Sequence, residues 1–184
     1  MAKQVLMVLA DGFEEIEAIT PVDVLRRAGL EVTLAGLSGK TVTGAHNIKF
    51  QADITLDEYK DLPDAIVLPG GMLGAQNLGR SPKVLELIKK VYNENKLVGA
   101  ICAAPALVVA PTGILNGKKA TCYPGFEKNF PSTVAFSKDR VVVDGNIITS
   151  RGPGSAFEFA LELVEQLAGK EKAEQLSQGM LVKG

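Results

Sequence analysis

Histidine and cysteine are scarce in this sequence of 184 residues, which contains one histidine and two cysteines. Cys102 and Cys122 stand at unrelated positions, so they form neither a disulfide framework nor a spacing typical of a metal site. The single histidine, His46, cannot build a zinc cluster. We therefore expect a cytoplasmic protein from a reducing compartment that uses no metal ion or other cofactor.

Long apolar runs and an excess of charge of one sign are also missing. No run approaches the ~18 apolar residues that span a bilayer. The apolar stretch Val5 to Leu9 is followed at once by acidic residues, unlike a signal peptide. The sequence has twenty basic and twenty-one acidic residues, which are scattered along the chain. It therefore lacks the cluster of positive charge that binding to nucleic acid or a membrane surface normally needs. We expect a small-molecule partner.

Continuous apolar runs recur along the chain, each followed by a glycine-bearing turn and a helical pattern. Such runs are typical of strands buried on both faces, and their alternation with helices predicts an α/β fold with a mostly parallel sheet. The length suits one domain, residues 1–184, that buries about 70% of the surface of its unfolded chain. The predicted strands are Val5 to Leu9, Val32 to Ala35, Ala65 to Leu68, Leu97 to Ile101 and Ile147 to Thr149, and the predicted helices span about 14–28, 82–95, 104–109 and 153–168.

Several local features qualify this pattern. Pro21 falls inside the first predicted helix, which therefore either kinks or consists of two short helices. Residues 39–52 resemble a small hairpin, and residues 134–143 resemble another. Gly169 is predicted to end the last long helix.

Cys102 stands where a predicted strand gives way to a helix. Ligands of open parallel sheets bind beyond the C-terminal strand ends, and residues 11–17, 69–71 and 150–154 also follow strands. The positive end of a helix dipole and unpaired backbone N–H groups favour a thiolate and a lowered thiol pKa. The position predicts a reactive nucleophile, against the alternative of a buried cysteine that packs as a small hydrophobe. Cys122, in a short strand-like stretch, fits that alternative.

Acidic residues at the start of the first helix offer an acid–base partner for the thiol. Glu14, Glu15 and Glu17 have an ordinary role there in complementing the helix dipole, but Glu14 and Glu17 also share a helix face. A carboxyl desolvated above the strand ends has a raised pKa and donates a proton near neutral pH. The pair Gly70-Gly71 forms either a tight turn or an oxyanion site, in which the Gly71 N–H acts with the N–H after Cys102.

Two basic side chains, of His46 and Arg151, are further candidates for the site. His46, in Gly-Ala-His-Asn, is predicted to be a solvated turn residue. No histidine stands next to Cys102, which argues against a cysteine–histidine dyad for proteolysis. Arg151, before a proline-initiated helix, either binds an anion or pairs with a carboxylate in a surface salt bridge.

Five segments carry a family resemblance: Glu-Glu-x-Glu at 14–17, Pro-Val-Asp-Val-Leu-Arg-Arg-Ala-Gly at 21–29, Leu-Pro-Gly-Gly at 68–71, Ala-Ile-Cys-Ala-Ala-Pro at 100–105 and Ser-Arg-Gly-Pro-Gly at 150–154. Together they resemble the ThiJ/PfpI superfamily, most closely the branch of the parkinsonism-associated deglycase and chaperone and its bacterial relatives. The resemblance covers essentially the whole chain. It implies a flavodoxin-like, three-layer α/β sandwich and a homodimer.

The resemblance also implies residue roles. The family's reactive cysteine falls on Cys102, its protonated carboxyl partner on Glu17, and its oxyanion-type amides on Gly71 and Ala103, with Gly70 beside them. Pro153 corresponds to a residue beside the pocket.

Further positions concern the dimer contact and the pocket wall. The helix face with Glu14, Asp23 and Arg27 corresponds to the family's dimer contact near the pocket. Where the animal branch has a pocket histidine, this chain has Tyr123, which donates a hydrogen bond but is no base at pH 7. Where that branch has a pocket arginine, this chain has His46, which remains a candidate for a different role in the pocket.

The leading hypothesis is a cofactor-independent glyoxalase or protein deglycase, of the hydrolase or lyase class. It would act on methylglyoxal-type dicarbonyls or on their early adducts, including glycated protein, through attack by the Cys102 thiolate and proton transfer by Glu17. One alternative is an oxidative-stress sensor or chaperone in which Cys102 is oxidised. A weaker one is a cysteine peptidase or amidase, as in the PfpI branch.

Overall fold

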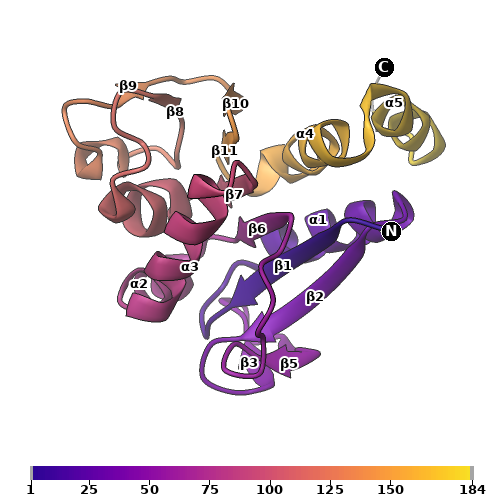
Figure 1. Ribbon diagram of the computed structural model, residues 1–184, viewed down its shortest axis with the longest axis horizontal. Helices are drawn as coiled ribbons and strands as arrows, with labels where there is room; N and C mark the ends of the chain where they lie inside the picture. The colour runs from indigo at the N-terminus through magenta and orange to yellow at the C-terminus, as the bar shows by residue number, and fades with distance from the viewer. Residues whose placement is uncertain (1, 183–184) are drawn as a thin grey trace.

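The central sheet consists of short apolar strands (Figure 1). In the computed structural model, which describes residues 2–182, seven strands lie in the order β10-β11-β7-β6-β1-β2-β5. All neighbours pair in parallel except β10, which is antiparallel to β11. Five of the strands confirm the predicted apolar runs. The sheet contains β1 (Gln4–Leu9), β2 (Glu31–Gly36), β5 (Ile54–Thr55), β6 (Ala65–Leu68), β7 (Leu97–Ile101), β10 (Val141–Asp144) and β11 (Ile147–Ser150).

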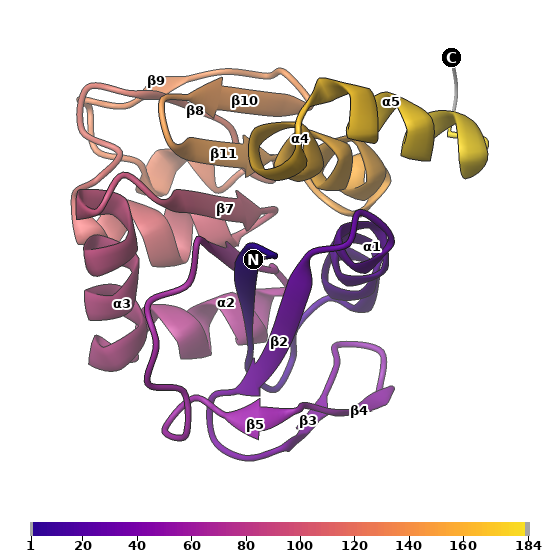
Figure 2. The same ribbon diagram turned by 45° about the vertical axis from the view of Figure 1, so that its right-hand side comes forward.

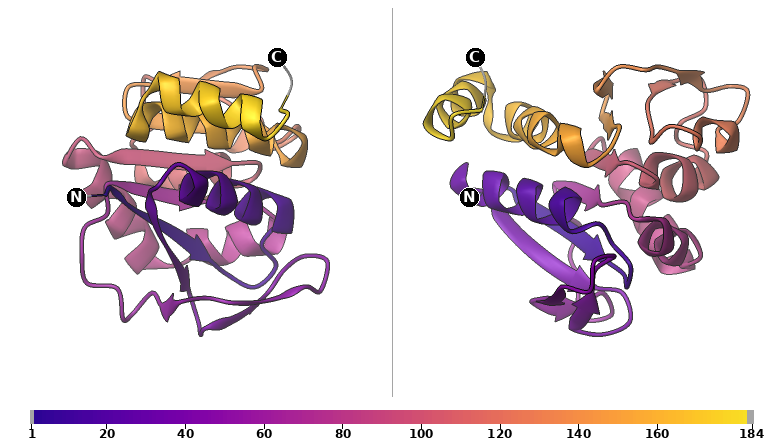
Figure 3. Two further views of the ribbon diagram at one scale, coloured as in Figure 1. Left: turned by 90° about the vertical axis from the view of Figure 1, so that its right-hand side faces the viewer. Right: turned by 180° about the vertical axis from the view of Figure 1, so that it is seen from behind.

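Helices cover both faces of this sheet, as Figures 2 and 3 show. On one face α1 packs against α4, and α4 against α5; on the other, α2 and α3 contact a short π-helix. Side chains from both layers, such as Leu25, Ile88 and Phe159, are fully buried against the strands. The predicted α/β layering is confirmed. The helices are α1 (Glu15–Arg27), α2 (Met72–Gly79), α3 (Pro82–Asn93), α4 (Ala156–Ala168), α5 (Lys170–Gly179) and the π-helix Pro105–Val109, with 3-10 turns at Ala110–Thr112, Glu127–Asn129 and Pro153–Ser155.

The helix α1 runs unbroken past Pro21, so the alternative of two short helices is wrong. The N-cap is Glu14, whose side chain accepts the Glu17 N–H at 2.8 Å. Because Pro21 removes only the bond to the Glu17 carbonyl, the remaining ladder and the buried face of the helix carry it through. Gly169, at φ 93°, follows α4 as predicted.

One predicted hairpin is present and the other is wrong. Strands β3 (Thr41–Thr43) and β4 (Lys49–Gln51) pair antiparallel within residues 39–52. In contrast, β9 (Ala135–Phe136) pairs in parallel with β8 (Lys119–Ala120), and β10 pairs with β11. The actual turn lies just beyond the predicted segment, where Gly145 adopts φ 62° in a two-residue loop between Asp144 and Ile147.

No helix in the described part of the chain is long and apolar enough to cross a membrane.

Candidate active site

The four candidate segments meet at one edge of the sheet. Strands β11, β7, β6 and β1 are adjacent and parallel, so their C-terminal ends lie side by side. The residues after them include Arg151 and Gly152, Cys102, Gly70, and the start of α1 with Glu17. This confirms that the predicted segments converge.

The backbone of Cys102 is held in an unusual conformation. Its φ of 65° lies in the left-handed region, which costs a residue other than glycine about 1–3 kcal/mol. The Cys102 N–H donates to the Ser150 carbonyl at 2.9 Å, and its carbonyl accepts the Tyr123 N–H at 2.8 Å. These two bonds fix the thiol at the junction between β7 and the following helical turn.

Glu17 lies beside Cys102 because residue 70 has no side chain. Oε2 of Glu17 accepts the Gly70 N–H at 2.9 Å. A Cβ on Gly70 would lie 2.6 Å from that oxygen, 2.6 Å from the Cys102 Cβ and 3.0 Å from its Sγ. The predicted carboxyl and thiol are therefore neighbours around the empty Cβ position of Gly70.

The Glu17 carboxyl is fully buried. Burial, helped by the nearby charge of Glu14, raises its pKa to about 7, although hydrogen bonding with the Cys102 thiol and the Gly70 N–H lowers it in part. A carboxyl with this pKa exchanges its proton near neutral pH. The predicted raised pKa of a carboxyl at the strand ends is thus present at Glu17.

The expected low pKa of Cys102 is not what this environment produces. The residue is only 8% exposed, and burial, together with the charge and hydrogen bonding of Glu17, raises the pKa of its thiol. The N–H groups of Gly71 and Ala103 oppose this by hydrogen bonding to the sulfur, which lowers the pKa. The helix that follows is a five-residue π-helix, too short for its dipole to dominate. The thiol therefore keeps its proton unless the ionised Glu17 carboxylate removes it.

The second oxygen of Glu17 has no protein partner. Oε1 is buried and receives no hydrogen bond from the described residues. A Cβ on Gly152 would lie 3.9 Å from this oxygen and 3.1 Å from the Tyr123 ring. Buried carboxylate oxygens normally have a hydrogen-bond partner, so this oxygen is an exception that the described residues do not explain.

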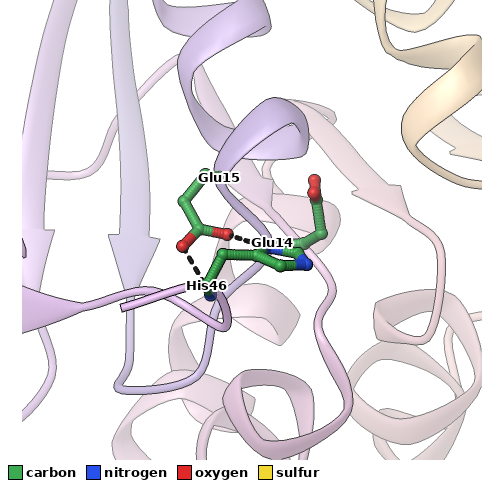
Figure 4. Close-up of side chains that lie close together, drawn as sticks. All are labelled: Glu14, Glu15 and His46. Atoms are coloured by element: carbon green, nitrogen blue, oxygen red, sulfur yellow. Dashed lines mark hydrogen bonds and ion pairs between the residues drawn. The ribbon is translucent and has the colours of Figure 1, made fainter. Parts of the chain in front are cut away.

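His46 pairs with Glu15 at the start of α1 (Figure 4). Its Nδ1 pairs with Oε2 of Glu15 at 2.7 Å, and its backbone N–H donates to Oε1 of Glu15 at 2.7 Å. The ring is exposed, as predicted for a turn residue, but it is tied to a buried carboxylate. Burial alone raises the pKa of Glu15, yet the His46 contacts bring it below its usual value, and the pairing raises the pKa of His46. Sequence reasoning missed this pair.

Glu14, Glu15 and His46 are also the side chains whose spacing suits a metal ion. One possible ligand atom from each lies within 4.8 Å of the others. However, both oxygens of Glu15 are engaged by His46, and Oε2 of Glu14 caps α1. The arrangement is explained by these contacts, which attach the β3–β4 loop to the start of α1.

The remaining predicted residues lie in three places. Tyr123, Gly152 and Pro153 line one cavity of about 180 Å³, together with Arg151. Asp23 and Arg27 form an exposed ion pair at 2.8 Å on α1, whereas Glu14 is buried and turned inward as the N-cap. Cys122 is fully buried, consistent with packing as a hydrophobe.

Comparison with known proteins places this geometry in a family. Residues 3–166 match the model of the DJ-1/PfpI family. The chain is 44% identical over 185 residues to Protein dj-1beta of Drosophila melanogaster, covering 99% of this chain and 98% of that protein. The crystal structure of Drosophila melanogaster DJ-1beta superposes with a TM-score of 0.96 at 43% identity and covers all of both chains.

Two further relatives extend the comparison. The chain is 41% identical over 165 residues to a Caenorhabditis elegans protein named glutathione-independent glyoxalase DJR-1.2, covering 89% of this chain and 87% of that one. It is 47% identical over 181 residues to Protein DJ-1 homolog B of Arabidopsis thaliana, covering 97% of this chain but only 41% of that protein's length. On the family match and these identities, the chain belongs to the DJ-1/PfpI family.

Proposed function

We propose that the protein is a cofactor-independent glyoxalase that converts methylglyoxal-type dicarbonyls into 2-hydroxy acids. The observation that carries the proposal is the buried Glu17 carboxyl, held by the Gly70 N–H against Cys102 with a pKa of about 7. The name of the nematode relative, a glutathione-independent glyoxalase, supports this activity class. Early adducts of the same dicarbonyls with protein amines enter the same first step once the C–N bond breaks and the free amine and aldehyde are released, as in a deglycase.

In the proposed reaction the Glu17 carboxylate takes the thiol proton of Cys102 as the sulfur attacks, and the Gly71 and Ala103 N–H groups stabilise the negative charge that develops on sulfur. The thiolate forms a bond to the aldehyde carbon, and Glu17 gives its proton to the aldehyde oxygen. The resulting Glu17 carboxylate removes the hydrogen from that carbon and returns it to the adjacent one, while the hydroxyl proton moves to the former ketone oxygen.

This transfer leaves a thioester on Cys102. The aldehyde carbon has been oxidised and the ketone carbon reduced, so no external electron acceptor is needed. Water then breaks the carbon–sulfur bond, and this releases the 2-hydroxy acid and regenerates the thiol. Glu17, which lies beside the sulfur, acts as the acid that protonates the aldehyde oxygen and as the base that moves the carbon-bound hydrogen.

The test is product formation from methylglyoxal without glutathione, followed as lactate by NMR. Wild-type protein should form lactate, and Cys102→Ser and Glu17→Gln should reduce the rate at least a hundredfold. Cys122→Ser, which changes the other buried cysteine, should remain active. Lactate formation at the wild-type rate by Cys102→Ser would refute the assignment.

A second candidate function is redox sensing, which the raised pKa of Glu17 favours. If Cys102 is oxidised by peroxide to a sulfinate, a protonated Glu17 is placed to donate a hydrogen bond to the new oxygens. Mass spectrometry after mild peroxide treatment distinguishes this role: Cys102 should gain two oxygens before Cys122 is modified. An unmodified Cys102 under those conditions would remove the sensor hypothesis.

A further inference from the structure

Arg151 is not explained by the fold or by the proposed reaction. Among the described residues, no carboxylate forms an ion pair with it, so the predicted alternative of a surface salt bridge is wrong. The one side-chain bond of Arg151 runs from Nη1 to the Lys138 carbonyl, at 2.9 Å. A guanidinium has five N–H donors, so most of this group remains free to bind an anion.

The cavity beside Arg151 is electropositive. Its lining residues include two arginines, Arg140 and Arg151, and no acidic residue. Arg140 is already neutralised, because it pairs with Glu158 at 2.6 Å and also donates to the Gly154 carbonyl. The unpaired positive charge of the cavity therefore comes from Arg151.

This cavity borders the reacting pair. Gly152 lines it and also faces the partnerless Oε1 of Glu17, with its Cβ position 3.9 Å from that oxygen. Tyr123 lines the opposite wall, and its N–H holds the Cys102 carbonyl. A molecule whose aldehyde reacts at Cys102 can therefore extend its other end into the cavity.

We propose that the substrates of this site are α-oxoaldehydes with a short tail that ends in a carboxylate, and that Arg151 binds this carboxylate. The inference rests on the proposed glyoxalase function. The cavity volume of about 180 Å³ suits a tail of a few carbon atoms. Tyr123 and Pro153 provide its apolar walls, and the guanidinium provides a charge-assisted hydrogen bond at its end.

The first experiment compares two substrates that differ only in the tail. Methylglyoxal is neutral, whereas 4,5-dioxovalerate carries the same α-oxoaldehyde with a carboxylate two methylenes away. Wild-type kcat/KM should be at least about tenfold higher for dioxovalerate. The ratio of the two kcat/KM values should fall about tenfold in Arg151→Gln, recover in Arg151→Lys, and stay unchanged in the control Arg80→Gln, which changes an exposed arginine outside the cavity lining. An equal preference for both substrates in the wild type would overturn the inference.

The second experiment does not depend on turnover. Cys102 is alkylated with neutral iodoacetamide and with anionic iodoacetate, and the modified peptide is quantified by mass spectrometry. The iodoacetate-to-iodoacetamide rate ratio cancels changes in thiol ionisation. This ratio should fall severalfold in Arg151→Gln and not in the control Arg80→Gln, at an exposed arginine outside the cavity lining.

The two experiments separate the two proposals. If neither aldehyde is converted, the glyoxalase proposal fails while the alkylation ratio still decides whether Arg151 binds anions next to Cys102. If methylglyoxal is converted but Arg151→Gln changes neither the kcat/KM ratio nor the alkylation ratio, the glyoxalase proposal stands and only the binding of a carboxylate by Arg151 is contradicted. If Cys102 reacts with neither iodoacetate nor iodoacetamide, the proposed role of Arg151 is also overturned, because the cavity then gives no access to the sulfur.

Discussion

The Gly70 amide donates a 2.9 Å hydrogen bond to Oε2 of Glu17, and the two residues are 53 positions apart in the sequence. The bond joins the end of β6 to the first turn of α1. It brings the carboxyl close to the sulfur of Cys102, because both groups lie around the position that a side chain of residue 70 would occupy. The acid–nucleophile pair thus depends on the absence of a side chain at residue 70.

Gly70→Ala should separate the pair. The new methyl group would lie 2.6 Å from both Glu17 Oε2 and the Cys102 Cβ, so one of them must move, at a cost of about 1–3 kcal/mol. We expect methylglyoxal turnover to fall at least tenfold and the urea midpoint to decrease. Gly39→Ala, where no atom lies within 4 Å of the new Cβ, is the control. Unchanged turnover in Gly70→Ala would contradict the proposed geometry.

Glu17→Gln should change how stability depends on pH. The folded-state pKa of Glu17 is raised from 4.5 to about 7, so the folded state holds a proton that the unfolded chain releases between these values. The contribution of Glu17 to the free energy of unfolding therefore falls by up to about 3 kcal/mol as pH rises from 4.5 past 7. Urea unfolding at pH 5 and pH 8 should show this loss in the wild type and not in Glu17→Gln. If the stabilities of the wild type and of Glu17→Gln depended on pH in the same way, the Glu17 carboxyl would not be desolvated.

The single histidine gives a direct probe of the β3–β4 loop. Pairing with Glu15 raises the pKa of His46, so the stabilising pair is complete below about 6.5 and is lost as pH rises through the raised value. NMR titration of the imidazole should give a pKa above 6.5 in the wild type and a lower one in Glu15→Gln. Glu31→Gln, at an exposed position, is the control. A wild-type pKa at or below 6.5 would exclude the pair in solution.

We also propose that a second copy of the chain covers the outer face of α1. Ile16 and Ile19 are 53% and 41% exposed there, and Ile19 lines a groove of about 360 Å³ with Val22 and Phe50. Apolar area of this kind is typical of subunit contacts. Light scattering should give twice the chain mass of 19.5 kDa, and Ile19→Glu should shift it toward the monomer, unlike Leu62→Glu. A wild-type monomer at micromolar concentration would contradict the proposal.

The sequence predicts the sheet better than its surroundings. Uninterrupted apolar runs such as Ala65–Leu68 can be satisfied only by burial on both faces, and they are strands. Helix α2 is missed because Gly74 and Gly79 obscure its pattern, and α5 because it is mostly polar. The pairing of β9 is missed because a two-residue parallel contact depends on tertiary packing.

The candidate site shows the same division. Chain order and strand ends suffice to bring Cys102, Glu17 and Gly70 together. The rise in the pKa of the Cys102 thiol depends on desolvation, which only three-dimensional packing reveals. One feature of the sequence points to the turn at Cys102, where φ is 65°. Pro105 begins the next helix, so the chain must turn from the strand into the helix within residues 102–104.

The pH profile of Cys102 alkylation by iodoacetamide, measured on the Cys102 peptide between pH 4 and pH 10, distinguishes a thiol activated by Glu17 from an ordinary buried thiol. If Glu17 and Cys102 share a proton, the rate should rise to a plateau with an inflection at or below the Glu17 pKa of about 7. An inflection at or above about 8.5, the value of an ordinary thiol, would contradict the account. It would identify Cys102 as a buried thiol that Glu17 does not activate.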